Sequence, residues 1–596
     1  MRNSKLILVS FILMIFIFSC SDDFFDKSPP GTLSDEVFAN EDGINALLLG
    51  SYGLLTTSDQ GGCITNYIMG SMASDEACKG SEEMDGAHLN PQVQWIVPTD
   101  HRSSMEKWRW AFDGINKTNQ VLRLVNRTED LSSAFEDRVR GEARFLRALY
   151  TFEAWLWFKN IPIITEETED PSRVTNINPE GAVLAQIISD LEFAWTHLPA
   201  SQAEVGRPTR YAAMALAAKA YLQEVDYASA KPLLDNIITS GRYEFMPNFM
   251  DNYRIETNNN AESIFEIQYT VDGWGGNAGP GRRWSFPHGA LGLAPGFHQA
   301  TQNLVNKFRV DENGLPMFDT FDEDDLKHDH RVASSAQFVP FEDEVDPRLD
   351  WTVSRRGVPL MDWGINRGFD FIRDQVFAGP YLPAGPKFLH QRKYHGTEET
   401  IPGLNHRLST KNFRYLRYTH VLLWRAEIAA YEGELDLAHE LVNKVRERAG
   451  NEVLMGRVLI YELPGSVWPW GEGTTHDDYM NPDVTAVDWT QPAANYNIGL
   501  YPPFTDNAEA MRAVQWEIHL EFAMEGSRFF DLRRWEKLPG DLKVNMAETL
   551  NRFAEVDCRN RHFMCGATFP ERAKYQPIPQ VEIDLAPDYL VQNPGY

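Results

Sequence analysis

Cysteine and positive charge are both scarce in this chain. Its 596 residues include five cysteines, and none has the short Cys-x-x-Cys spacing of a zinc site, so no metal is predicted. Lys and Arg number 56 against 85 Asp and Glu, a net charge of −29. Because nucleic acid requires a basic surface, no nucleic-acid partner is expected, and strongly anionic polysaccharides are weakly disfavoured. After the first 20 residues no apolar run is long enough to cross a bilayer.

The chain begins with an export signal. Arg2 and Lys5 precede an apolar run from Leu6 to Phe18, and Ser19 and Cys20 follow it. A basic start, an apolar core and a small residue before the cut predict a lipoprotein signal peptide over residues 1–19. Its removal would leave Cys20 as a lipid-carrying N-terminus that anchors the chain to a membrane. An ordinary cleaved signal peptide with a chance cysteine is the alternative.

Four further cysteines are present: Cys63, Cys78, Cys558 and Cys565. An exported protein can oxidise them to disulfides, and four cysteines allow three pairings between which the sequence does not choose. Buried free thiols are the alternative.

The chain is predicted to be mainly α. Apolar residues recur at helical spacing near 34–55, 108–125, 139–150, 180–198 and 209–224. Two segments, 211–241 and 418–450, share a pattern of small residues at matched positions (Ala218, Ala230, Ala426 and Ala438). Small residues let two antiparallel helices approach closely, so both segments predict tetratricopeptide-like helix pairs.

The composition divides the chain into regions. A tether over residues 20–33 leads into a helical region, 34–250; a Gly-, Pro- and Trp-rich region, 251–410, follows; and a C-terminal region, 411–596, contains an aromatic insertion at 454–505. Loops of this length in a compact protein are usually functional. We therefore expect the ligand-facing part of the molecule within 251–410.

Several segments together resemble the SusD/RagB family of nutrient-binding outer-membrane lipoproteins. They are residues 20–29 (CSDDFFDKSP), 140–150 (RGEARFLRALY), 414–427 (RYLRYTHVLLWRAE), 521–535 (EFAMEGSRFFDLRRW), 575–579 (YQPIP) and 592–596 (QNPGY). The serine and acidic residues directly after Cys20 also resemble the tag that sends such lipoproteins to the cell surface.

This resemblance implies a helical scaffold with four tetratricopeptide-like helix pairs and a loop-rich portion packed against it. It also implies a function: a lipid-anchored, cell-surface protein of the outer membrane that captures an oligosaccharide and delivers it to a SusC-like TonB-dependent transporter. No catalytic residue and no cofactor are expected.

Aromatic loops supply the candidate ligand-binding residues. A tryptophan offers a rigid flat surface to the apolar face of a sugar ring, and Asp or Arg fixes its hydroxyls. Trp274, Arg283 and Trp284 lie in a glycine-rich stretch that can expose them, and the resemblance adds the region of Asp75 and Trp95. The alternative is that these tryptophans are core anchors.

Other functions are weighed against this one. Relatives that capture peptides suggest a peptide ligand instead, and a lipid-anchored glycoside hydrolase or a protein-binding repeat adaptor are further rivals. Glu521 and Glu525 have the spacing of one helical turn, but the arginines that follow favour a structural charged network over a catalytic pair. The acidic run 319–329 is expected to be a solvated loop because it lacks a calcium-loop pattern.

Overall fold

The computed structural model describes residues 38–57, 62–270, 296–333, 409–458 and 487–596, together with most of 336–394. The predicted signal peptide, Cys20, the tether, Trp274, Arg283 and Trp284 lie outside the described residues.

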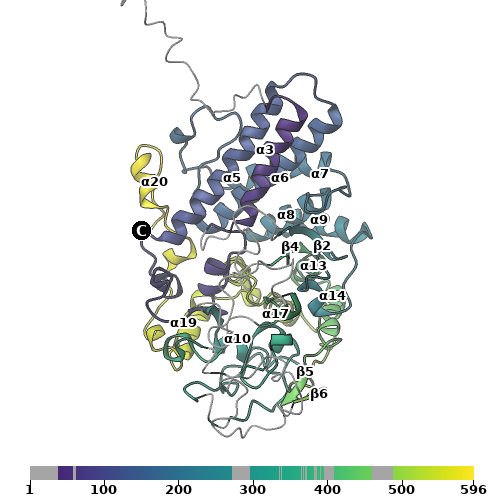
Figure 1. The fold of residues 1–596 in the computed structure, drawn as a ribbon, viewed down its shortest axis with the longest axis vertical. Helices are drawn as coiled ribbons and strands as arrows, with labels where there is room; N and C mark the ends of the chain where they lie inside the picture. The colour runs from purple at the N-terminus through teal and green to yellow at the C-terminus, as the bar shows by residue number, and fades with distance from the viewer. Residues whose placement is uncertain are drawn as a thin grey trace, which may run out of the picture.

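Helices dominate the described chain, as predicted (Figure 1). The longer ones are α3 (Glu41–Gly53), α5 (Arg102–Arg127), α6 (Ser133–Phe158), α7 (Ala182–His197), α8 (Arg210–Gln223), α9 (Tyr227–Thr239), α13 (Tyr418–Glu432), α14 (Leu435–Ala449), α17 (Asn507–Glu521), α18 (Arg528–Trp535) and α19 (Met546–Asp557). Short helices are α4 (Asn90–Val93), α10 (Gln302–Asn306), α11 (Arg348–Thr352), α12 (Gln375–Ala378) and α20 (Gln580–Leu585). In Figure 1 the long helices α3, α5, α6 and α7 lie side by side in the upper half, and α10, α17 and the last strands lie in the lower half.

Local sequence explains where the helices begin and how closely two of them pack. Asn40 caps α3 by accepting a hydrogen bond from the Gly43 amide at 2.9 Å. Gly114 of α5 faces Tyr150 of α6, and a Cβ at position 114 would lie 2.4 Å from that ring. Glycine therefore sets the close approach of the two 26-residue helices.

Both predicted helix pairs are confirmed. Helices α8 and α9 pack together, and so do α13 and α14. The four alanines that suggested the pattern, Ala218, Ala230, Ala426 and Ala438, are all fully buried. Helix α13 also packs on α9, so the two pairs lie next to each other although they are far apart in the sequence.

Three two-stranded antiparallel sheets occur among the described residues. β1 (Ala77–Gly80) pairs with β3 (Phe297–Ala300), β2 (Ser263–Ile267) with β4 (Phe413–Arg417), and β5 (Met455–Val458) with β6 (Val487–Pro492). The first two sheets join the loop-rich region to the helical regions on either side of it in the sequence.

The N-terminal and C-terminal helical regions share one core. A single cluster of buried apolar side chains extends from Ile44 to Leu590. Polar contacts cross it as well: the Tyr227 hydroxyl donates to Glu427 Oε1 at 2.6 Å. The boundaries drawn from composition therefore do not separate independent hydrophobic cores in the described chain.

The cysteines adopt both of the states that the sequence left open. Cys558 and Cys565, at the end of α19, form a disulfide. Cys63 and Cys78 are buried thiols, and burial raises the pKa of both.

Candidate functional site

The last residue of α17, Glu521, lies in a buried network of ion pairs. Its Oε1 accepts a hydrogen bond from Arg448 and lies 3.4 Å from Arg417 Nη2, and its Oε2 lies 3.5 Å from Arg348 Nη1. Burial alone would raise the pKa of this carboxyl, but the three guanidinium groups outweigh it and hold that pKa below its usual value.

Glu525, in the turn between α17 and α18, continues the same network. It pairs with Arg417 Nη1 at 2.5 Å and with Lys387 Nζ at 2.7 Å, and it accepts a hydrogen bond from the Tyr253 hydroxyl at 2.7 Å. Against the effect of burial, these cations hold the pKa of Glu525 far below its usual range. A charged network is present, as predicted, but its cations are Arg348, Lys387, Arg417 and Arg448 from distant segments and not the arginines that follow Glu525 in the sequence. Neither carboxylate holds the proton that a glycosidase acid requires.

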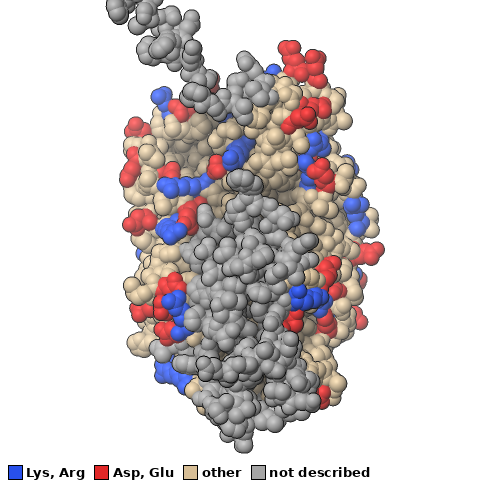
Figure 2. Space-filling model, in the orientation of Figure 1, with Lys and Arg blue, Asp and Glu red and all other residues tan. Residues whose placement is uncertain are grey.

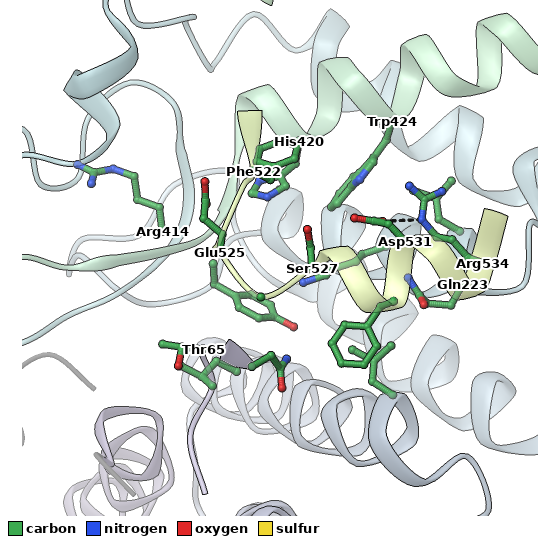
Figure 3. Close-up of a pocket in the computed structure, with 18 of the residues that line it drawn as sticks. Thr65, Gln223, Arg414, His420, Trp424, Phe522, Glu525, Ser527, Asp531 and Arg534 are labelled. Carbon is green, nitrogen blue, oxygen red and sulfur yellow. Dashed lines mark hydrogen bonds and ion pairs between the residues drawn. The ribbon is translucent and has the colours of Figure 1, made fainter. Parts of the chain in front are cut away.

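A small cavity adjoins this network, between β4, α8, α13 and α18. Figure 3 shows its lining, in which His420, Trp424 and Phe522 lie on one side and Thr65 on the other. The His420 ring stacks on Phe522 with centroids 4.1 Å apart. Asp531 accepts a hydrogen bond from Arg534 Nε at 2.8 Å. The cavity measures about 60 Å³, which holds a few water molecules but no sugar ring.

A second cavity, here called the His298 cavity, lies at the ends of two segments outside the described residues. Its lining includes Tyr253, His298, Lys387, Phe388 and Lys411, and its volume is about 70 Å³. His298 follows 271–295 closely in the chain, and Lys411 follows 395–408.

The His298 side chain itself is unusual. It has a φ of 57° and is 2% exposed, and its Nε2 has no hydrogen-bond partner among the described residues. Burial lowers the pKa of His298 to about 3, so the ring is neutral.

Asp75 and Trp95, both predicted to contact the ligand, are buried and have structural contacts instead. Asp75 is fully buried and accepts two hydrogen bonds from Arg528, at 2.8 and 3.1 Å, and one from Lys307 at 2.8 Å. Although burial opposes it, these cations hold the pKa of Asp75 well below its usual range. The charge predicted to meet a sugar is thus already compensated inside the protein.

Trp95 is 2% exposed, so its indole offers no face to a ligand. It packs edge-on against Phe569 with centroids 5.5 Å apart, and its N–H donates to the Ala73 carbonyl at 2.8 Å. The alternative named for the tryptophans, a core anchor, applies to this one.

Larger openings occur at the surface. Two adjoining clefts of about 330 and 240 Å³, here called the β2 clefts, share the turn Glu204–Arg207 and residues Phe265 and Glu266 of β2. A third cleft, of about 300 Å³, is lined by residues of α17, α18 and α19 and is here called the α17 cleft. Each is several times larger than the interior cavities.

The acidic run 319–329 is tied to its surroundings by side-chain contacts. Asp322 pairs with Arg552 Nε at 2.5 Å, and Asp325 accepts a hydrogen bond from the Asn306 amide at 3.0 Å. Among the described residues no group of three or more His, Cys, Asp or Glu side chains is arranged to hold a metal ion. Likewise, none of the described helices has the length and apolarity needed to cross a bilayer.

Charges of both signs are interspersed over the described part of the face shown in Figure 2. His298 and Lys387 could not be identified from the sequence, because each is isolated in a loop-rich stretch and meets its neighbours in the cavity only through folding.

Comparison with known proteins identifies the fold. A family model for the SusD family matches residues 261–596, and a second, described as starch-binding associating with outer membrane, matches residues 23–222. SusD-like protein P2 from Formosa agariphila is 25% identical over 456 residues, which cover 74% of this chain and 80% of the relative. SusD-like protein P25 from the same organism is 24% identical over 304 residues, 49% of this chain and 55% of the relative, so that match spans about half of the relative's length.

Solved structures share the same architecture. A SusD superfamily protein from Bacteroides vulgatus superposes with a TM-score of 0.67 at 20% identity, covering 94% of this chain and 100% of the other. Surface glycan-binding protein A from Bacteroides thetaiotaomicron, in complex with laminarihexaose, superposes with a TM-score of 0.62 at 19% identity, covering 93% and 99%. Since the SusD model alone covers more than half of the residues, this chain belongs to the SusD family.

Proposed function

We propose that this protein is a lipid-anchored outer-membrane lipoprotein that captures an oligosaccharide at the cell surface and passes it, chemically unchanged, to a SusC-like TonB-dependent transporter. The observation that carries the proposal is family membership, since two family models span residues 23–222 and 261–596. The fold shared with a surface glycan-binding protein that holds laminarihexaose supports a glycan as the ligand.

The proposed lipid anchor is inferred from the N-terminal sequence. Residues 1–19 form an export signal, and Cys20 is the residue that would carry the lipid. The family description that places relatives at the outer membrane supports this location. A multiply acylated cysteine holds a protein firmly to a bilayer, so no membrane-spanning helix is needed.

Trp274, Arg283 and Trp284 remain the proposed ligand contacts. Their segment begins shortly after Gln268, which lines one of the β2 clefts, and ends shortly before His298. A glycine-rich segment between these points can present flat aromatic surfaces to the apolar face of a sugar, while the arginine donates to its hydroxyls.

Binding by the soluble form that lacks residues 1–20 tests the proposal. A glycan array identifies the ligand, and titration calorimetry then compares wild type with Trp274→Ala and Trp284→Ala. Trp195→Ala, a half-buried tryptophan on α7, is the matched control. We expect both loop variants to lose about five- to tenfold in affinity with unchanged melting temperature, since one stacked aromatic contributes about 1–1.5 kcal/mol.

Three results would contradict the proposal. They are wild type that binds peptides but no oligosaccharide, hydrolysis of the bound glycan by purified protein, and loop variants that bind as tightly as the Trp195 control. The transporter is tested separately. The lipidated protein should co-purify from outer membranes with a TonB-dependent barrel, and recovery of the protein without a barrel would contradict delivery to a transporter.

A further inference from the structure

The α17 cleft has the composition of a second ligand site. It is open to the surface, measures about 300 Å³, and is lined by charged, amide, hydroxyl and aromatic side chains. The residues described in its lining lie outside 271–295, the segment that contains the proposed oligosaccharide contacts Trp274, Arg283 and Trp284, so each site can be tested by its own variants.

The floor of the cleft is rigid and electrostatically compensated. Asp75 is held by Arg528 and Lys307, as described above, and the Lys307 ammonium lies 5.2 Å from the Phe321 ring centroid and 5.4 Å from that of Trp516. A buried ammonium that is paired and flanked by aromatic rings keeps its position, so the floor is preorganised.

The rim carries two exposed arginines. The side chain of Arg512 is 47% exposed and pairs with Asp319, and that of Arg552 is 60% exposed and pairs with Asp322. The cations that line the cleft are Lys307, Arg512, Arg528 and Arg552, and the carboxylates are Asp75, Asp322 and Glu548. Although the chain as a whole carries a charge of −29, the cations that line this cleft outnumber the carboxylates that line it, four to three.

Hydrogen-bond donors are also in excess. The indole N–H groups of Trp516 and Trp535, which both line the cleft, are buried and have no hydrogen-bond partner among the described residues. A buried donor left unpaired costs free energy that a ligand oxygen, or a water held by the ligand, removes. Such a lining fits a ligand rich in acceptor oxygens and bearing a negative charge.

We infer that the α17 cleft binds a single carboxylate-bearing sugar unit, a uronic acid. Its carboxylate lies between the Arg512 and Arg552 guanidinium groups, which suit planar carboxylates. Its ring oxygens face the wall that contains Trp516. The ring fits a cleft of this volume, whereas the interior cavities are too small for it.

Glucuronate and glucose form a matched pair of probes, because they differ only in oxidation at one carbon. Binding of each to the soluble chain lacking residues 1–20 is measured by titration calorimetry and saturation-transfer NMR. We expect glucuronate to bind with a dissociation constant on the order of 1 mM, a value typical of a ligand of this size, and glucose at least tenfold more weakly.

The variants locate the site. Arg512→Gln and Arg552→Gln each remove an exposed cation and should weaken glucuronate binding about three- to tenfold, because a charge-assisted contact is lost. Arg173→Gln, whose side chain is 71% exposed and lies outside the cleft, is the control. Trp516→Phe, which removes the N–H and keeps a ring, should also weaken binding.

The inference is overturned if glucose binds as well as glucuronate, if neither binds, or if Arg173→Gln weakens binding as much as the cleft variants. Because oligosaccharide capture is assayed through Trp284, either site can fail while the other is upheld.

Discussion

Replacement of Glu521 by glutamine tests the buried ion network that joins α17 to the rest of the fold. The substitution keeps the shape of the side chain and removes one negative charge from beside three arginines. Glu521, Arg348 and Arg417 have fully buried side chains, and that of Arg448 is 1% exposed. Because these side chains are buried, hydration by water cannot compensate for the negative charge that is removed.

The expected loss in the free energy of unfolding depends on which carboxylate partner each arginine keeps. Loss of one partner from a buried ion pair costs about 3–5 kcal/mol. Arg448 retains Glu262 at 2.8 Å and Arg417 retains Glu525 at 2.5 Å, while Arg348 retains Asp346 at 2.7 Å. Because every cation keeps one carboxylate, we expect a loss near the lower end, about 3 kcal/mol.

Urea unfolding of the soluble form, followed by tryptophan fluorescence, measures this loss at pH 7. Glu106→Gln is the matched control, since Glu106 pairs with the 60%-exposed Arg102 one helical turn away. A helical pair of this kind, in which the arginine is exposed and the glutamate side chain is 16% exposed, contributes about 0.2–0.5 kcal/mol.

The stability difference between wild type and Glu521→Gln should depend on pH with a definite sign. The folded-state pKa of Glu521 is lowered, so its contribution is present above the unfolded value of about 4.3 and disappears as the pH falls toward the folded value. Wild type and Glu521→Gln should therefore differ fully at pH 7 and converge in acid. A loss below about 1 kcal/mol, or one no larger than that of the Glu106 control, would refute the argument.

Three further predictions concern a buried acid, a buried tryptophan and the disulfide. Burial, together with the nearby Asp75, raises the pKa of Glu76 to about 8. The folded state therefore holds a proton that the unfolded state releases above about pH 4.3, so the free energy of unfolding should fall as the pH rises from 5 to 8. Melting curves across that range should decline for wild type and flatten for Glu76→Gln; parallel curves would contradict this. Trp95→Ala should lower the free energy of unfolding by about 3–5 kcal/mol and leave glycan affinity unchanged below its melting temperature, the opposite of the result expected for Trp284→Ala; calorimetry of both variants decides. Serine at Cys558 and Cys565, seven residues apart, should cost about 2 kcal/mol, and reductant should lower the melting temperature of wild type but not of the variant.

The helical segments were predictable from the sequence because their signals are local. Apolar residues three and four positions apart placed α7 and α8 close to their observed bounds, whereas α5 and α6 extend beyond the predicted segments 108–125 and 139–150. The helix pairs followed from alanines whose small side chains permit close packing, and these alanines are buried as expected. Glu521 and Glu525 were also predicted to be structural, but from the arginines that follow them, whereas the cations that bind them in the structure come from distant segments.

The candidate site was less predictable. Trp95 was named as a ligand contact because the family resemblance points to its region, but Phe553 of α19 and Phe569 enclose its ring. Asp75 was named as a ligand contact from the same resemblance, yet Lys307 and Arg528 compensate its charge. These partners come from remote parts of the chain, and a single sequence contains no record of such encounters.

The sequence by itself determined the helical class, the two helix pairs and the resemblance to the SusD family, since each rests on spacing within short segments. Tertiary structure decided which cysteines pair, which acids are neutralised, and which tryptophan is lost to the core. It also decided where clefts remain, because burial, pKa and cavity shape arise from contacts between segments that only folding brings together.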